Sequence, residues 1–151
     1  MHKVFMKQST MPGTAEQMMH FHELPDVFKL LTPPPSHIQV LRNDLTSLTY
    51  GELEFRLWVM FIPLHWLVRH EPGPLALSFI DRMLDGPMAF WEHQHIFQDV
   101  PNGVQLTDYL TIEHRPGLMG FFTRLVFDGL PLQFLFFYCH WVTRRALVKM
   151  Q

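Results

Sequence analysis

The sequence predicts an α+β fold in which an antiparallel sheet packs against a C-terminal helix. Between residues 38 and 113, apolar and polar residues alternate with the period of two that half-buried strands require. From Leu118 to Val148 the apolar residues recur at helical spacing instead. The connections between the alternating runs are too short for parallel crossovers, so the strands should form an antiparallel meander. A chain of 151 residues can bury a core without cross-links, and we expect a single domain over residues 1–151.

The N-terminal part is expected to contain one strand and two short helices. The strand, Val4–Met11, has side chains of alternating polarity. Thr14 follows, with Gln17 three residues later at the spacing of a capping box, so a helix should begin there and continue to His22. A second short helix is predicted over Asp26–Leu31, because a proline stands at its start and three consecutive prolines follow it.

Further strands are expected before a central hairpin, each separated from the next by residues typical of turns. They are Ile38–Asp44, Glu52–Phe61, Leu64–Glu71 and Leu75–Leu84. Together with the N-terminal strand and the two strands of the hairpin, they would give a sheet of about seven strands.

The hairpin brings aromatic, histidine and carboxylate side chains together. Alternation along its first strand sends four side chains to one face: Trp91, His93, His95 and Phe97. Asn102-Gly103 is a strong signal for a two-residue turn. The strand pairs predicted from this turn are Phe97 with Asp108, His95 with Leu110 and His93 with Ile112. Asp108 would then join the histidines on the inner face, on a diagonal from His95 where the two side chains can meet.

The apolar residues after the sheet predict one dominant helix, Leu118–Val148, with a bend near Leu130 where Gly129 and Pro131 interrupt it. Irregular packing at the bend should leave space between the helix and the sheet. Polar residues interrupt the apolar run before it reaches the roughly 20 residues of a membrane span, so we expect no membrane insertion. The inner stripe of the helix is predicted to be Leu118, Phe122, Leu125, Leu132, Leu135, Cys139, Val142 and Ala146.

The composition narrows the class of partner. The chain is 48% hydrophobic and 14% aromatic, which is more apolar surface than one core needs and favours an apolar ligand. A formal charge of -2 and the lack of a basic cluster apart from Arg144-Arg145 argue against a nucleic-acid partner. Cys139 is the only cysteine, which excludes an internal disulfide, and no secretory leader opens the sequence. We therefore expect a cytoplasmic protein.

Several motifs together resemble the SRPBCC superfamily, which includes START lipid-transfer domains, polyketide cyclases and aromatases, and the major birch pollen allergen. The likeness is greatest to its bacterial ligand-binding members, often described as cyclase/dehydrase-like, and it covers nearly the whole chain. The motifs are Leu31-Thr32-Pro33-Pro34, Asp81 leading to Gly86-Pro87, Trp91–Phe97, Thr107–Leu110, and Pro116-Gly117 leading to Gly120.

The resemblance implies the helix-grip fold, a curved antiparallel sheet wrapped around the long C-terminal helix. It also implies a cavity between the two for an apolar or amphipathic small molecule. This agrees with the alternating strands and the very apolar helix. These bacterial proteins share no agreed reaction, so the resemblance assigns no catalytic residue.

Binding of a hydrophobic or aromatic small molecule between the sheet and the C-terminal helix is the preferred hypothesis for function. One alternative is a cyclase/dehydrase-type enzyme acting on a polyketide-like or aromatic substrate, with His95, Asp108 and Tyr109 as candidate catalytic groups. Another is a protein-interaction module, for example a homodimer, that uses the aromatic C-terminal helix. The residues predicted to contact a ligand are Trp91, His93, His95, Phe97, Asp108, Leu110, Phe122, Leu125, Leu132, Leu135 and Cys139.

His93 and His95 also have the spacing of metal ligands on a strand, with Asp108 as the third ligand. The preferred interpretation is that they are structural groups of the sheet, hydrogen-bonded to Asp108, to backbone or to water, because buried polar groups need partners. On this interpretation the chain holds no metal and no cofactor.

Overall fold

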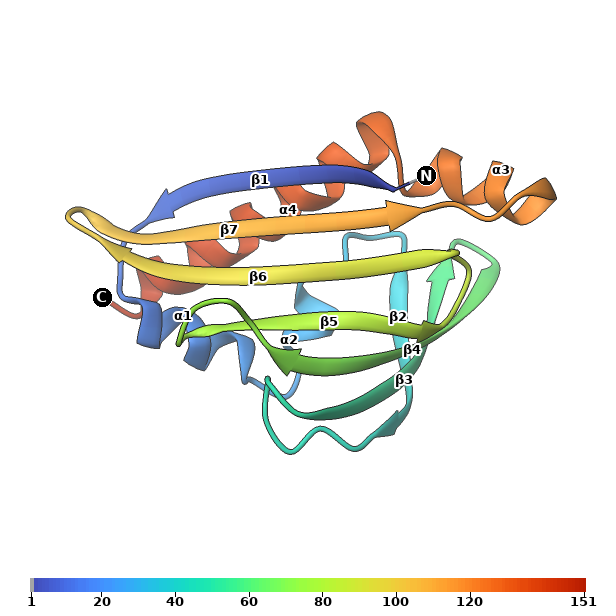
Figure 1. Cartoon of the computed structure of the whole chain (residues 1–151). Coiled ribbons are helices and arrows are strands. Elements are labelled where there is room, and N and C mark those ends of the chain that lie inside the picture. Colours follow the sequence, from blue (N-terminus) through green and yellow to red (C-terminus); the bar gives the residue numbers. More distant parts are fainter. Residues whose placement is uncertain (1) are drawn as a thin grey trace.

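A curved seven-stranded antiparallel sheet forms one layer of the computed structural model, which describes residues 2–151 (Figure 1). The strand order is β1-β7-β6-β5-β4-β3-β2, so the N-terminal strand pairs with the last strand and the rest form a meander. Both the strand number and the antiparallel arrangement confirm the sequence prediction. The strands are β1 Lys3–Met11, β2 His37–Asn43, β3 Gly51–Val59, β4 Ile62–Pro72, β5 Ser78–Asp85, β6 Phe90–Val100 and β7 Gly103–Glu113.

Helices form the second layer. Figure 1 shows α4, Gly129–Lys149, running behind the sheet, with α1, Ala15–His22, beside its C-terminal end. The capping box that begins α1 is present, because the Thr14 side chain accepts a hydrogen bond from the Gln17 backbone and the Gln17 side chain accepts one from the Thr14 backbone. The second short helix, α2, is shorter than predicted and spans Val27–Leu30.

The prediction of one continuous helix over residues 118–148 is wrong, because two helices occupy this segment, but the interruption expected near Leu130 is present. α3, Gly117–Val126, and α4 are bent by 49° at a short break. Asp128 caps α4 by accepting from the Gly129 backbone, and Gly129 has a φ of 57°, a left-handed conformation that glycine adopts without strain. Pro131 lies in the first turn of α4, where a missing N–H costs no helical hydrogen bond.

The predicted register of the hairpin is wrong by two residues. Val100 pairs with Gly103, so the turn is Pro101-Asn102 rather than Asn102-Gly103. Proline fixes the φ that the first turn position needs, which favours this alternative. As a result His95 lies opposite Asp108, and His93 lies opposite Leu110. A shift of two residues preserves alternation, so every side chain remains on its predicted face.

The core lies between α4 and the concave face of the sheet. Phe127, at the end of α3, packs its ring against Trp66 of β4 and Trp91 of β6, with centroid distances of 5.5 Å and 5.8 Å. Leu132 and Phe136 of α4 are buried beside this group. The bend between the helices therefore inserts an aromatic ring into the core where the sequence led us to expect space.

Within residues 2–151, no single helix is both long and apolar enough to cross a membrane. Among the helices that the structure describes, only the bent pair of α3 and α4, taken together, reaches the necessary length and hydrophobicity.

Candidate functional site

A cluster of histidines and carboxylates lies on the concave face, where the sequence placed His93, His95 and Asp108. The His93 Nε2 donates to Asp108 Oδ1 at 2.7 Å, and the other oxygen of Asp108 accepts from His140 Nε2 at 2.6 Å. The predicted pair of His95 and Asp108 is in reach, with 3.4 Å between Nδ1 and Oδ1. The stronger hydrogen bond of His95 goes elsewhere, to Asp81 Oδ2 at 2.7 Å.

Two members of this cluster, Asp81 and His140, were not recognised as site residues from the sequence. Asp81 lies on β5 directly opposite His93, and its alternation with Phe79 would have placed it on the inner face. His140 was missed because the inner stripe was extended from α3 into α4 without a break. The break at Asp128 resets the helical phase, so the buried stripe of α4 is Leu132, Phe136, His140, Thr143 and Leu147.

Several predicted ligand residues of α3 and α4 lie away from the interior. Leu125 is 59% exposed. Phe122 and Leu135 are only partly buried, and the half-buried Cys139 directs its Sγ toward the Leu31 carbonyl at 3.3 Å. Tyr109 lies on the opposite face of β7 from Asp108, since it is the next residue along the strand. The remaining predicted residues, Trp91, Phe97, Leu110 and Leu132, are buried in the core.

Both carboxylates of the cluster are held in the ionised form. Burial on its own would raise the pKa of Asp81, but the hydrogen bond from His95 and the nearby His93 outweigh it and lower the pKa to about 2. Burial likewise opposes ionisation of Asp108, yet the hydrogen bonds from His140 and His93 hold its pKa well below the usual range. The cluster therefore contains two negative charges in a largely buried place.

The pKa values of the imidazoles shift in different directions. Burial disfavours the charged form of His93, but its hydrogen bond to Asp108 outweighs burial and raises its pKa. The pKa of His95 is lowered, first by burial and then by the neighbouring His93. His22 of α1 stands against the same group, and burial together with His95 lowers its pKa to about 4. Neighbouring histidines of the cluster therefore differ in proton affinity.

Aromatic rings enclose the cluster. Phe79 stacks on His95 with a centroid distance of 4.1 Å, and Phe136 of α4 meets His93 edge-on at 5.2 Å. The two histidine rings are 3.7 Å apart. Packing of this kind fixes the direction of each ring nitrogen.

Asp81, His93 and His95 are a group within residues 2–151 that could hold a metal ion, since one ligand atom from each lies within 4.8 Å of the others. The sequence had suggested Asp108 as the third ligand. In the structure Asp108 instead lies behind His93 and accepts a hydrogen bond from its Nε2, the ring nitrogen that faces away from Asp81.

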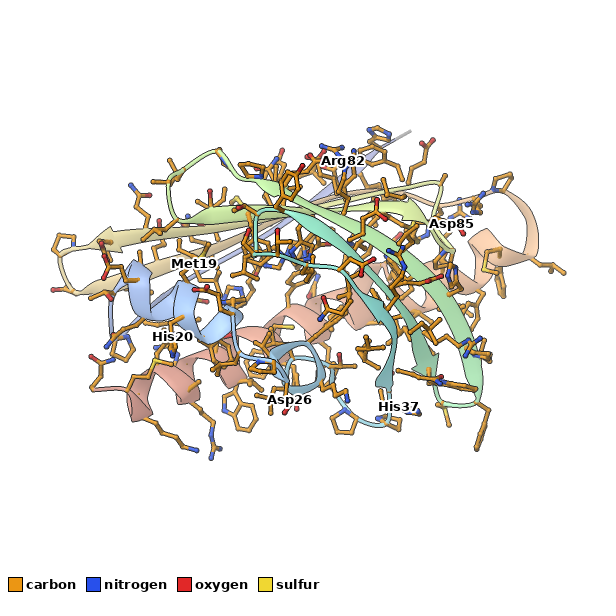
Figure 2. All side chains as sticks on the ribbon, turned by 90° about the horizontal axis from the view of Figure 1, so that it is seen from below. Met19, His20, Asp26, His37, Arg82 and Asp85 are labelled. Atoms are coloured by element: carbon orange, nitrogen blue, oxygen red, sulfur yellow. The ribbon has the colours of Figure 1, made fainter. Side chains whose placement is uncertain are left out.

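A groove of about 590 Å³ lies on the outer side of α4, facing α1, α2 and the segment between them. In Figure 2, α1 and α2 can be found beside α4 by the labelled His20 and Asp26. The lining is mostly apolar, and its only charged members are Arg145 and Lys149. The residues that line the groove are Phe21, Leu24, Leu30, Trp141, Val142, Arg145, Ala146, Lys149 and Met150.

Solved structures similar to this chain share its fold. A START superfamily protein from Mycobacterium smegmatis is 12% identical, with all of each chain covered and a TM-score of 0.70. The Zhui aromatase/cyclase from Streptomyces sp. R1128 is also 12% identical, covering 99% of this chain and 93% of its own, with a TM-score of 0.66. A norcoclaurine synthase mutant from Thalictrum flavum, in complex with a transition-state analogue, is 8% identical, covering 100% and 98%, with a TM-score of 0.67.

No protein-family model matches the chain, and no curated protein matches it either. At identities this low, the solved structures show the fold alone. They confirm the curved sheet and C-terminal helix that the sequence resemblance implied.

Proposed function

We propose that this chain, which has the helix-grip fold of the SRPBCC superfamily, binds a hydrophobic small molecule with an acidic head group. The observation that carries this proposal is the apolar groove along α4 with cations at its rim. The solved structures named above support the general class, because they include an aromatase/cyclase and a synthase holding a transition-state analogue.

The groove suits such a ligand in size and chemistry. Its volume of about 590 Å³ lies within the range of small-molecule sites in proteins. Phe21, Leu24 and Val142 offer apolar contact to a tail, and each CH₂ group removed from water contributes about 0.8 kcal/mol. Arg145 and Lys149 stand without a carboxylate among the lining residues, so an anionic head is favoured over a cationic one.

This location differs from the one that the sequence suggested, between the sheet and α4. There, the rings of Trp66, Trp91 and Phe127 pack against one another. A ligand in that place would have to displace core side chains, whereas the groove needs no rearrangement. We therefore propose the groove as the primary site. Contact with Trp91 or Phe97 stays a prediction for ligands that enter the core.

Titration with a fluorescent 16-carbon fatty acid tests the groove. Ala146 is a half-buried lining residue, and the Ala146→Trp variant should fill the groove and weaken binding at least tenfold. Val148→Trp, on an exposed position of α4 outside the lining, is the matched control and should bind as wild type does. Equal binding by both variants would place the ligand elsewhere, and absence of binding in wild type would refute the proposal.

The head group is tested separately. Replacing Arg145 and Lys149 together with glutamine should weaken binding of the acid roughly tenfold but leave its neutral methyl ester unchanged. Arg144→Gln changes the adjacent exposed cation outside the lining and should have no effect. If the double variant weakened acid and ester alike, the cations would act through packing, as the contact of Arg145 over Trp141 allows, and not through charge.

A protein-interaction module is a second candidate, favoured by apolar side chains exposed along α3 and α4. Sedimentation velocity of wild type and of a Phe121→Ser variant tests it, since a dimer formed through this surface should dissociate in the variant. The exposed residues are Leu118, Met119, Phe121, Leu125, Leu130, Phe134, Phe137, Trp141 and Val148.

A cyclase/dehydrase-type enzyme is a third candidate, favoured by the partial exposure of His95 beside two carboxylates. Incubation with a polyketide-like aromatic probe would show turnover by mass spectrometry, and His95→Asn should abolish it. Binding without turnover would leave the chain as a carrier or sensor.

A further inference from the structure

We propose that Asp81, His93 and His95 form a binding site for a divalent transition metal such as Zn²⁺ on the concave face of the sheet. His93 and His95 lie two residues apart on β6 and point to the same face. Asp81 stands directly opposite His93 on β5. Two imidazoles and one carboxylate are a ligand set that zinc and its neighbours in the transition series commonly take.

The distances between the ligand atoms are those of a metal site. Asp81 Oδ2 is 2.7 Å from His95 Nε2 and 3.6 Å from His93 Nδ1. In a tetrahedral zinc site with bonds of about 2.1 Å, neighbouring ligand atoms stand roughly 3.4 Å apart. Small side-chain rotations reach this geometry. The metal would take the place of the proton that His95 Nε2 now shares with Asp81, and this proton would move to His95 Nδ1, which faces Asp108 Oδ1 at 3.4 Å.

The groups behind the ligands are arranged as in known metal sites. His93 Nε2 donates to Asp108, which leaves the Nδ1 lone pair free to face Asp81 and His95. Asp108 is itself held by His140, whose other ring nitrogen is 2.7 Å from Ser9 Oγ. A carboxylate that orients a ligating histidine in this way is the usual second layer of a metal centre.

Charge and access favour a cation at this place. Asp81 and Asp108 together carry two negative charges, which a divalent ion with neutral imidazoles would balance. The three proposed metal ligands are also more exposed than the two residues behind them. The Asp81 side chain is 18% exposed and the two histidines 12%, whereas Asp108 and His140 are 5% exposed. Three protein ligands would leave a coordination position for water or for an acidic group of a bound molecule.

The proposal is tested by titrating the full, chelator-treated chain with Co²⁺ and Zn²⁺. We expect one metal per chain with a Kd below about 1 μM. The visible absorption of bound Co²⁺ should be that of an ion with a low coordination number. Asp81→Asn and His95→Asn should each weaken binding at least a hundredfold. Asp108→Asn should weaken it 10 to 100 times while retaining one metal per chain, because Asp108 only positions His93.

The control is His65→Asn. His65 also stands between two carboxylates, Glu54 and Asp85, but on the exposed side of the sheet, and its loss should not change the affinity. If the ligand variants do not fold, the wild type alone still decides, because Zn²⁺ should raise its Tm and a chelator should reverse the rise. Binding weaker than millimolar, or equal binding by wild type and folded His95→Asn, would overturn the proposal.

Discussion

At the scale of single residues, Asp108 joins α4 to the sheet. One carboxylate oxygen accepts from His93 of β6 and the other from His140 of α4. Alternation within the hairpin was sufficient to predict that His93, His95 and Asp108 share a face. Their partners could not be predicted in the same way, since the contact with His140 depends on the rotation of α4 about its axis. That rotation is set by the exact position of the break at Asp128, which Gly129 and Pro131 indicate only approximately.

Replacing Asp108 with alanine should lower the free energy of unfolding by about 2 to 4 kcal/mol, because two buried histidine donors lose their acceptor. Urea unfolding of the metal-free protein at pH 7 measures the loss. Asp85→Ala is the control, since this exposed carboxylate contacts only His65 among the ion pairs described and should cost a few tenths of a kcal/mol. A loss equally small for Asp108 would contradict its role.

The lowered pKa of His22 predicts how the stability of the fold depends on pH. Its pKa of about 4 in the folded protein lies below the ordinary 6.5, so the unfolded chain binds the proton more tightly. Stability should therefore fall as the pH drops from 6.5 to about 4, by about 3 kcal/mol from this residue alone. The lowered pKa values of His70 and His95 act in the same direction, and the raised pKa of His93 opposes them.

Urea unfolding at pH 7 and pH 4.5, with chelator present, tests this dependence. His22→Asn keeps a donor for the Met18 carbonyl but cannot titrate, so its stability should change less between the two pH values. His20→Asn, on the exposed side of α1, should behave as wild type. Identical pH profiles for the His22 variant and wild type would show that other groups cause the loss.

At the scale of elements, the strands were easier to predict than the helices. Alternation and turn chemistry are local, and they placed each strand to within a few residues. The register of the β6–β7 hairpin was not decided in this way, because Pro101-Asn102 and Asn102-Gly103 are both acceptable turns with the same parity. The prediction for the helical segment failed for a related reason. Gly129 and Pro131 indicated an interruption, but its exact position determines which residues of the following helix face the sheet.

The break between α3 and α4 gives a prediction of its own. Gly129 has a φ of 57° with open space around its Cβ position, so Gly129→Ala should cost about 1 kcal/mol through backbone conformation alone. Pro131→Ala, two residues away, should cost less than about 0.5 kcal/mol, since the first turn of α4 does not need that N–H. Thermal unfolding compares the two, and a larger loss for Pro131→Ala would contradict this account of the bend.

At the scale of the whole molecule, the two proposed sites lie on different sides of α4. The polar cluster lies between α4 and the sheet, whereas the groove lies on the outer side, against α1 and α2. Their ligands can therefore bind independently. Sequence patterns could not reveal the groove, because it is formed by three helical segments whose mutual packing no local pattern describes.

The cationic rim of the groove predicts a dependence on salt. Raising the salt concentration from 50 mM to 500 mM should weaken binding of the fluorescent fatty acid several-fold, because salt screens the attraction between the rim cations and the carboxylate. Binding of the methyl ester should strengthen slightly or stay the same, since burial of the tail does not depend on charge. Equal salt dependence for acid and ester would argue against a contact of the head group with Arg145 and Lys149.

The most direct test of ligand binding on the outer side of α4 is a crystal structure of the protein with a long-chain carboxylate brominated on its tail. The anomalous signal of bromine locates the tail without any assumption about the site. The account predicts bromine beside Phe21, Val142 and Ala146, with the carboxylate near Arg145 and Lys149. Bromine between the sheet and α4, near Trp91 and Phe136, would contradict it, as would bromine bound only at scattered surface positions.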